Sequence, residues 1–146
     1  MAVNLKESAR QLLEVIPLVM QDIRSEMRRR GSLDLSVPQF RALAFVDRNE
    51  GASLWEVARH MGLTPPSTSR LVDNLIERDL MTRTDHPDDR RRVRLTVTSR
   101  GHRILQKSAD ETVSYLARKL SAVDADRREI IEKAVEELRI IFASAT

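Results

Sequence analysis

The feature that most constrains the fold is a break of three residues, Gly62-Leu63-Thr64, between two helical patterns. Before the break, Ser53 begins a Ser-x-x-Glu capping box, which predicts the start of a helix that Gly62 then stops. After the break, Thr64 is a favoured N-cap and Pro65 takes the first helical position, where proline is tolerated. Two helices joined by a three-residue turn that contains glycine are the order of a helix-turn-helix.

The second of these helices, near residues 65–79, has two unlike faces. At about 100° per residue, one face is mostly apolar and can rest on a scaffold, while the other is small and polar enough to enter a DNA major groove. Small hydroxyls in the first turns allow close approach to DNA, and the free N–H groups of a helix N-terminus favour phosphate. The inward set is Thr68, Leu71, Leu75 and Ile76, the outward set is Pro66, Arg70, Asp73, Asn74 and Glu77, and Ser67 and Ser69 flank them.

A hairpin is predicted directly after this helix. Residues 80–84 fit a short strand, and Val93, Leu95 and Val97 alternate with polar residues as in a half-buried strand. The loop expected between the strands is acidic and turn-forming at first and then becomes the arginine run Arg90–Arg92. A helix pair alone is equally well explained by a solvated amphipathic helix in an all-α core. The arginine-tipped hairpin shifts the balance toward a winged helix-turn-helix.

The remaining apolar patterns are helical and flank this central region. Helices are predicted over residues 5–29 with a stop at Gly31, from the capping box at Ser36 to about Arg48, from Ser99, and from an Asp124 cap onward. The first and the last two of these helices carry more apolar surface than the winged domain can cover, and an uncovered apolar stripe normally has a partner. A monomeric core completed by these helices is the alternative.

The fold class that follows is mainly α with a small β-hairpin wing: a winged helix-turn-helix with N- and C-terminal dimerisation helices. We assign residues 32–100 to the DNA-binding domain, and residues 1–31 and 101–146 to the helical dimerisation region.

The central run LTPPSTSRLVDNLIERDLMTRTDHPDDRRRVRLTVTSRG resembles the core of the MarR family of winged-helix regulators. The residues that carry the resemblance are Leu35-Ser36-Val37-Pro38-Gln39-Phe40, Leu54-x-x-Val57-Ala58-x-x-Met61-Gly62, Ser69-Arg70-Leu71-Val72-Asp73-x-Leu75, Asp88-x-Arg90-Arg91 and Leu95-Thr96-x-Thr98-x-x-Gly101. The chain departs from the family at Asp79-Leu80, where Gly-Leu is usual, so the geometry of the helix end is in question there.

The resemblance implies a ligand-responsive repressor that binds a pseudo-palindromic operator in double-stranded DNA as a homodimer. It also implies a small aromatic or phenolic effector, whose binding residues the sequence leaves unknown. Arg90 would enter the minor groove, Asp88 would hold Arg90 in place, and Arg91 and Arg92 would contact phosphates. The DNA-binding residues we expect are Pro66, Ser67, Thr68, Ser69, Arg70, Asn74, Asp88, Arg90, Arg91 and Arg92.

Other candidate sites are weaker. We interpret Arg28–Arg30 as cations that complement a helix C-terminus. Trp55 is expected on the outer side of its helix, where it covers the hairpin or the domain edge, with a ligand role as the minority option. His102 with Asp110 or Glu111 is the one pairing worth testing for zinc, although the three histidines are too scattered for a metal signature.

Composition excludes several functional classes. The chain has no cysteine, which removes disulfides and thiol-based redox sensing, and no catalytic grouping is present, so an enzyme is not expected. We expect no cofactor and no metal, no membrane span, and a cytoplasmic location. Two alternatives to a specific regulator stay open: a winged-helix protein-interaction module, and a non-specific architectural DNA-binding dimer.

Overall fold

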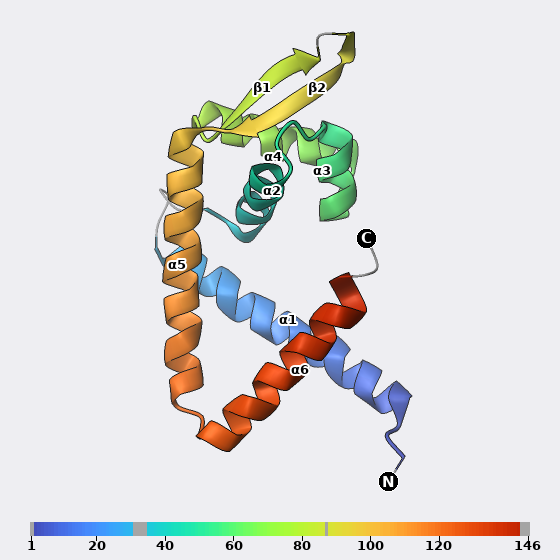
Figure 1. The fold of residues 1–146 in the computed structure, drawn as a ribbon, viewed down its shortest axis with the longest axis vertical. Helices are drawn as coiled ribbons and strands as arrows, with labels where there is room; N and C mark the ends of the chain where they lie inside the picture. The colour runs from blue at the N-terminus through green and yellow to red at the C-terminus, as the bar shows by residue number, and fades with distance from the viewer. Residues whose placement is uncertain (1, 31–34, 87, 144–146) are drawn as a thin grey trace. The chain divides into compact units, whose positions relative to one another are not determined.

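The computed structural model describes residues 2–30, 35–86 and 88–143, with only the backbone described at residues 86 and 89–92. Its elements run α1 (Leu5–Arg29), α2 (Val37–Arg48), α3 (Leu54–Met61), α4 (Pro65–Glu77), β1 (Met81–His86), β2 (Asp89–Val97), α5 (Ser99–Ser121) and α6 (Ala125–Ala143) (Figure 1). This order confirms the mainly helical winged helix-turn-helix fold. Within the described residues, none of the helices combines the length and apolar character needed to cross a membrane.

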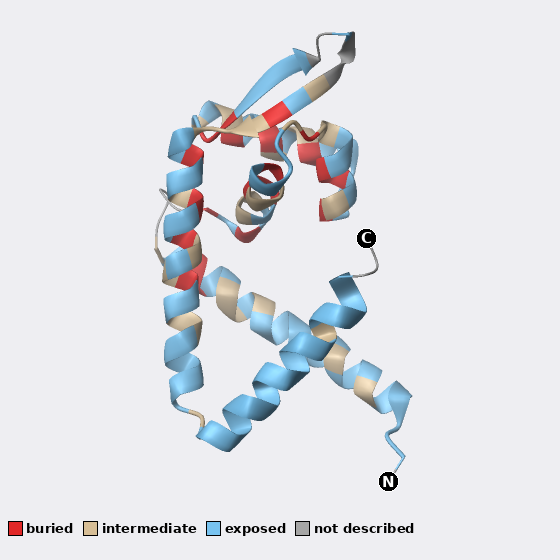
Figure 2. Cartoon of the chain, viewed as in Figure 1, coloured by how far each residue is buried: buried red, intermediate tan, exposed pale blue. Residues whose placement is uncertain are grey.

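The chain divides into two compact units, residues 1–108 and 109–146. The core of the first unit lies where α2, α3, α4 and the hairpin meet (Figure 2). Aliphatic residues dominate it, as the low aromatic content requires. Its fully buried members include Leu35, Leu43, Val46, Val57, Val72, Leu75, Leu80, Met81 and Leu95.

The helix starts agree with the capping signals in the sequence. Ser36 and Gln39 form a complete capping box, in which the Ser36 hydroxyl accepts from the Gln39 N–H and the Gln39 side chain accepts from the Ser36 N–H. Ser53 caps α3 by accepting from the Glu56 N–H, but the Glu56 carboxylate accepts from the Ser53 hydroxyl, so the predicted box is only half formed. Asp124 caps α6 through the Arg127 N–H. Gly31, the predicted stop of the first helix, lies outside the described residues.

The turn of the helix-turn-helix has the expected conformation. Thr64 caps α4 by accepting from the Ser67 N–H, and Pro65 begins the helix. Gly62 ends α3 with φ +66°, in the left-handed region where glycine carries no steric penalty.

The hairpin reaches farther toward its tip than predicted. The antiparallel ladder is regular from Met81 opposite Val97 to Asp85 opposite Val93, and then its register shifts so that His86 pairs with Asp89. The expectation of a long loop is therefore wrong, because strand pairing continues almost to the turn. The arginine run Arg90–Arg92 lies in the irregular part of β2 that this shift creates. Ala52 adds a bridge to Leu95, which ties the start of α3 to the wing.

Asp79 is the residue at which the chain departs from the family pattern, and its backbone explains the usual glycine. Its φ is +59°, and among the described residues no other non-glycine has a positive φ. An L-residue pays a steric penalty in this conformation, which aspartate tolerates better than most. Asp79 thus takes the left-handed backbone conformation that glycine adopts without this penalty.

A junction of four residues joins the end of α4, the wing and the start of α5. The Thr98 hydroxyl donates to the Asp79 carbonyl at 2.7 Å and accepts from the Gly101 N–H at 2.9 Å, so it caps α5. The Thr98 N–H donates to the Leu80 carbonyl at 3.1 Å. Gly101 is buried here, and a Cβ on it would overlap the Leu80 carbonyl oxygen and lie 2.9 Å from Val97 Cγ1.

The two long terminal helices bury little of their apolar surface within the chain (Figure 2). None of the residues of α6 is buried. In α1, only Glu26 and Met27, near its C-terminal end, are buried. The exposed large apolar residues are Leu5, Leu13, Val15, Ile16, Leu18 and Val19 on α1, and Ile130, Ile131, Val135, Ile140, Ile141 and Phe142 on α6.

We predict that Gly101→Ala lowers the free energy of unfolding by about 3 kcal/mol, because the new methyl group meets a backbone carbonyl that no side-chain rotation can relieve. Urea unfolding followed by circular dichroism measures the change. Arg100→Ala is the matched control, since Arg100 is exposed in the same helical turn and its loss should change stability by less than about 0.5 kcal/mol. Equal stability of the two variants would contradict the role given to this junction.

Candidate nucleic-acid interface

The outward face of α4 carries half of the ten predicted DNA-binding residues. Pro66, Ser67, Arg70 and Asn74 are exposed, and Ser69 is half-buried. Val72 and Leu75 anchor the opposite face in the core. The helix thus presents small polar side chains and one guanidinium to solvent. Its first turn offers no free N–H group, because residues 65 and 66 are prolines and the Ser67 and Thr68 N–H groups donate to Thr64.

Thr68 is the exception among the predicted residues on this helix. Its side chain is fully buried, and its hydroxyl donates to the Thr64 carbonyl at 2.9 Å. A hydroxyl in this position closes the first turn of α4 and cannot reach DNA. Thr68 therefore belongs to the scaffold of α4, and its prediction as a DNA contact is corrected here.

The tip of the wing holds the other predicted contacts. Asp88 lies in the turn and is exposed. Arg90, Arg91 and Arg92 belong to β2 by their backbone, but their side chains lie outside the described part of the structure. At the base of the wing, Arg83 Nη1 lies 4.0 Å from Asp73 Oδ1, an exposed ion pair between β1 and α4. Such a pair stabilises weakly.

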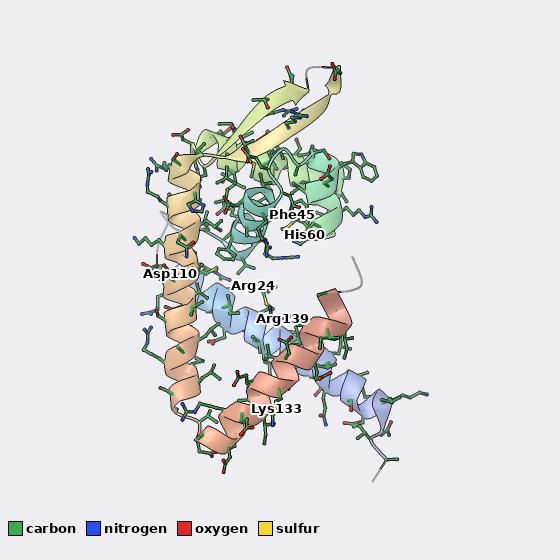
Figure 3. All side chains as sticks on the ribbon, in the orientation of Figure 1. Arg24, Phe45, His60, Asp110, Lys133 and Arg139 are labelled. Carbon is green, nitrogen blue, oxygen red and sulfur yellow. The ribbon has the colours of Figure 1, made fainter. Side chains whose placement is uncertain are left out.

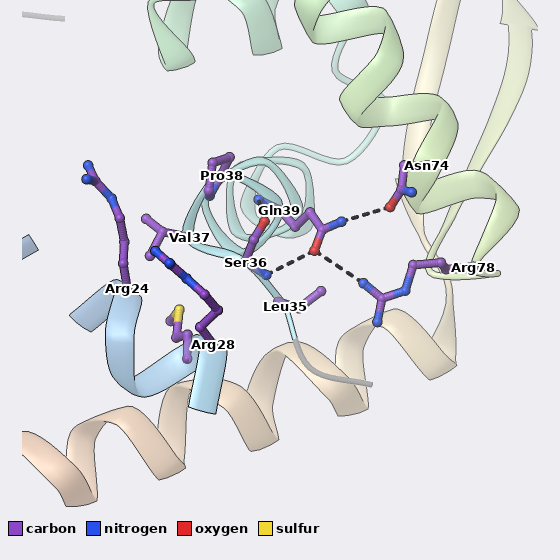
Figure 4. A pocket seen from close by; sticks show the side chains of 10 residues that line it. Arg24, Arg28, Leu35, Ser36, Val37, Pro38, Gln39, Asn74 and Arg78 are labelled. Atoms are coloured by element: carbon purple, nitrogen blue, oxygen red, sulfur yellow. Dashed lines mark hydrogen bonds between the residues drawn. The ribbon is translucent and has the colours of Figure 1, made fainter. Parts of the chain in front are cut away.

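A hydrogen-bond network connects the N-terminus of α2 to α4 (Figure 4). Gln39 Oε1 accepts from the Ser36 N–H at 2.9 Å and from Arg78 Nη1 at 3.2 Å. Gln39 Nε2 donates to Asn74 Oδ1 at 2.8 Å. Sequence reasoning identified Gln39 only as the partner in a capping box. Its reach to α4, some 35 residues away in sequence, depends on tertiary packing that a local motif does not report.

The same residues form one wall of a pocket of about 590 Å³ between α1, α2 and α4 (Figure 4). The described lining includes three arginines, Arg24, Arg28 and Arg78, and no acidic residue. Its apolar part is Met27, Leu35, Val37 and Pro38. A cavity with cationic groups over an apolar surface suits a flat anion with an apolar body.

Two of the three arginines in the basic cluster at the end of α1 pair with a buried carboxylate. Arg29 Nη2 lies 3.0 Å from Glu26 Oε1, and Arg30 Nε lies 3.5 Å from the same oxygen. The hydrogen bond from Arg29 is the main reason that the pKa of Glu26 is lowered, which keeps the carboxylate charged. Arg29 and Arg30 thus hold the end of α1, whereas Arg28 lines the pocket.

The histidines form side-chain pairs that sequence spacing did not predict. The ring of His60 stacks on Phe45 with centroids 4.4 Å apart (Figure 3). Burial, helped by Arg41 and Arg48, lowers the pKa of His60 and favours its neutral form. His102 Nδ1 lies 3.2 Å from Asp47 Oδ1 on α2, so its partner is neither Asp110 nor Glu111. Among the described side chains, no group of three potential ligands is arranged to hold a metal ion.

Trp55 projects from the outer side of α3, as its place in the helix predicted. It is 74% exposed, however, so it does not cover the hairpin or the edge of the domain.

The sequence and the fold of this chain are similar to those of known proteins. The sequence model that describes the MarR family matches residues 33–92. The HTH-type transcriptional regulator YhbI of Bacillus subtilis is 29% identical over 105 residues, which cover 72% of this chain and 68% of the relative.

Two solved structures share the fold across nearly the whole chain. FabT of Streptococcus pneumoniae, solved in complex with DNA, has a TM-score of 0.71 and 15% identity, with 98% of this chain and 100% of that chain covered. The MarR family protein Rv2887 of Mycobacterium tuberculosis, solved with p-aminosalicylic acid, has a TM-score of 0.70 and 20% identity, with 93% and 98% covered.

Three observations agree over the central domain: the fold, the motifs that build the α3–α4 pair and the wing, and the matched family model. Over residues 33–92 the chain is therefore similar to the MarR family of winged helix-turn-helix proteins.

Proposed function

We propose that this chain is a ligand-responsive repressor that binds a pseudo-palindromic operator as a homodimer. The observation that carries the proposal is the outward face of α4. Its first turns carry the hydroxyls of Ser67 and Ser69, and Arg70 follows directly after Ser69. Such a surface allows the backbone to approach a major groove closely, and its hydroxyl and guanidinium groups can donate to phosphates. The neighbour FabT, which was solved with DNA, supports this use of the fold.

The wing supplies the second part of the proposed interface. Val93, Leu95 and Val97 pack into or against the core and hold β2, so that the arginine run at its far end is carried on a fixed support. We assign Arg90 to the minor groove, where a narrow A·T-rich stretch attracts guanidinium, and Arg91 and Arg92 to phosphates. Asp88, in the turn, would orient Arg90 by a charge-assisted pair.

Dimerisation is the second element of the proposal. The exposed apolar residues of α1 and α6 form surfaces that a monomer would leave in water, and surfaces of this kind mark interaction sites. We propose that residues 1–31 and 101–146 form the dimerisation region and that residues 32–100 bind DNA. Two copies would then present two recognition helices to successive major grooves of an inverted repeat.

The effector is the third element, and the pocket between α1, α2 and α4 is where we place it. Arg24, Arg28 and Arg78 would bind a carboxylate or phenolate, and Met27, Leu35 and Val37 would contact the ring. Rv2887, which was solved with p-aminosalicylic acid, supports this class of ligand. An effector here would act by spreading the two recognition helices, so that their separation no longer matches the operator.

Two other functions use the same fold. A winged-helix protein-interaction module needs no arginine wing, and its binding would depend only weakly on salt. An architectural DNA-binding dimer would share the surface but would have little preference for its own promoter. Salt dependence separates the regulator from the first, and sequence preference separates it from the second.

We predict that Arg90→Ala weakens binding to the operator about ten- to hundredfold and lowers the slope of log affinity against log salt by about 1, because one cation leaves the DNA. Fluorescence-anisotropy titration at several salt concentrations measures both. Arg10→Ala, which removes the same charge from an exposed position on α1, should leave both values unchanged. Unchanged affinity in the Arg90 variant, with the dimer intact, would contradict the proposed role of the wing.

We predict that Val135→Glu shifts the protein from dimer to monomer, because the variant places a charge in the middle of the exposed apolar face of α6. Sedimentation velocity over a range of concentrations measures the mass. Arg128→Glu introduces the same charge on a polar position of α6 and should leave the dimer intact. If the unaltered chain is a monomer at micromolar concentration, the dimeric part of the proposal is wrong.

A further inference from the structure

The hydrogen bonds around Gln39 determine which way its amide faces. Both groups that approach its carbonyl oxygen, the Ser36 N–H and the Arg78 guanidinium, can only donate. The oxygen must therefore lie on that side, and the amino group must face Asn74. The hydrogen-bond partners alone identify the oxygen, because neither of these two groups can accept a hydrogen bond from an amino group.

The orientation of Gln39 in turn determines the orientation of Asn74. Since Gln39 offers an N–H, the atom of Asn74 that meets it at 2.8 Å must be the carbonyl oxygen. The amino group of Asn74 then lies on the side of its amide away from Gln39 (Figure 4). Asn74 is exposed on the outward part of α4, one turn after Arg70.

We propose that Gln39 is a positioning residue that fixes the amide of Asn74 with its amino group toward the DNA, so that Asn74 selects a base with acceptor atoms in the major groove. The inference rests on the proposed function, because it takes α4 to be the recognition helix. Guanine presents two acceptors, O6 and N7, at its major-groove edge. Thymine presents a single acceptor, O4, beside its methyl group, cytosine presents a donor, and adenine presents a donor beside its N7. The capping box of α2 thereby contributes to the base preference of a different helix.

Gln39→Glu is the variant that tests the inference. Glutamate is a standard residue at this position of a capping box, and its carboxylate still accepts from Ser36 and Arg78, so α2 and its link to α4 are retained. Its second oxygen, however, can only accept. Asn74 must then rotate its amide by half a turn, donate to the carboxylate, and present its own carbonyl oxygen to the DNA.

The experiment is selection of bound sequences from a randomised operator library by the unaltered protein, Gln39→Glu, Asn74→Ala and the double variant. We expect the unaltered protein to prefer guanine at one position of each half-site by about tenfold. Asn74→Ala should lose this preference, and Gln39→Glu should exchange it for adenine or cytosine. In the double variant the added change at residue 39 should have no further effect at that position.

Two results of this selection would overturn the inference. One is that Asn74→Ala keeps the base preferences of the unaltered protein, and the other is that Gln39→Glu keeps the preference for guanine. A merely structural role for Gln39 would weaken binding at all sequences alike without exchanging one base for another.

A measurement without DNA separates this inference from the proposed function. In the free protein, side-chain amide NMR signals should show Asn74 amino protons that exchange faster with water in the unaltered protein than in Gln39→Glu, where the carboxylate accepts from them. If no sequence preference is found for any of the variants, the specific-regulator proposal fails, and this exchange comparison still decides the orientation. Equal exchange in both proteins would show that Gln39 does not orient Asn74.

Discussion

The close contact of Gly101 with the Leu80 carbonyl is the constraint on which the arrangement of the DNA-binding surface depends. It brings Leu80, three residues after the end of α4, into backbone contact with the start of α5, and the Thr98 hydroxyl joins the Asp79 carbonyl and the Gly101 N–H with two hydrogen bonds. The wing leaves from this junction on β1 and returns to it on β2. The direction of the wing relative to the recognition helix is therefore set by backbone geometry, which is stiffer than side-chain packing.

A second set of contacts holds the C-terminal end of α4. Gln39 joins two successive turns of that helix, through Asn74 and Arg78, to the N-terminus of α2. Arg78 and Gln39 also line the pocket that we assign to the effector. A ligand that draws Arg78 toward an anion would compete with Gln39 for the same guanidinium. Ligand binding in the pocket would therefore act on one of the contacts that hold α4 against α2.

Much of this fold is predictable from sequence because its signals are local. Capping residues at Ser36, Ser53 and Thr64, the glycine at 62 and the alternation from Val93 to Val97 each act within a few residues of where they occur. The inward face of α4 followed from helical spacing alone. Thr68 follows the same rule: helical spacing places it inward, and the structure buries it, which is incompatible with its prediction as a DNA contact.

What sequence could not predict depends on contacts between distant segments. The length of β2 depends on cross-strand pairing. The pairs Asp85–Val93 and His86–Asp89 carry the strands into the acidic-to-basic stretch that composition alone suggested was loop, and residues 90–92 lie in the register shift between these pairs. The partner of His102 is Asp47, 55 residues away, and the partner of Gln39 is on another helix. No local motif encodes these pairs, so the orientation of Asn74 became visible only in the folded chain.

The central claim is that this molecule recognises a specific inverted repeat with two copies of α4 and its wing. The most direct test is a footprint of the full chain on the DNA upstream of its own gene at physiological salt, with and without aromatic carboxylates. The account predicts protection of about 20 base pairs arranged as an inverted repeat, two half-sites one helical turn apart, and loss of protection when an effector binds. Even coverage of the DNA without a protected repeat would contradict it and would favour an architectural role.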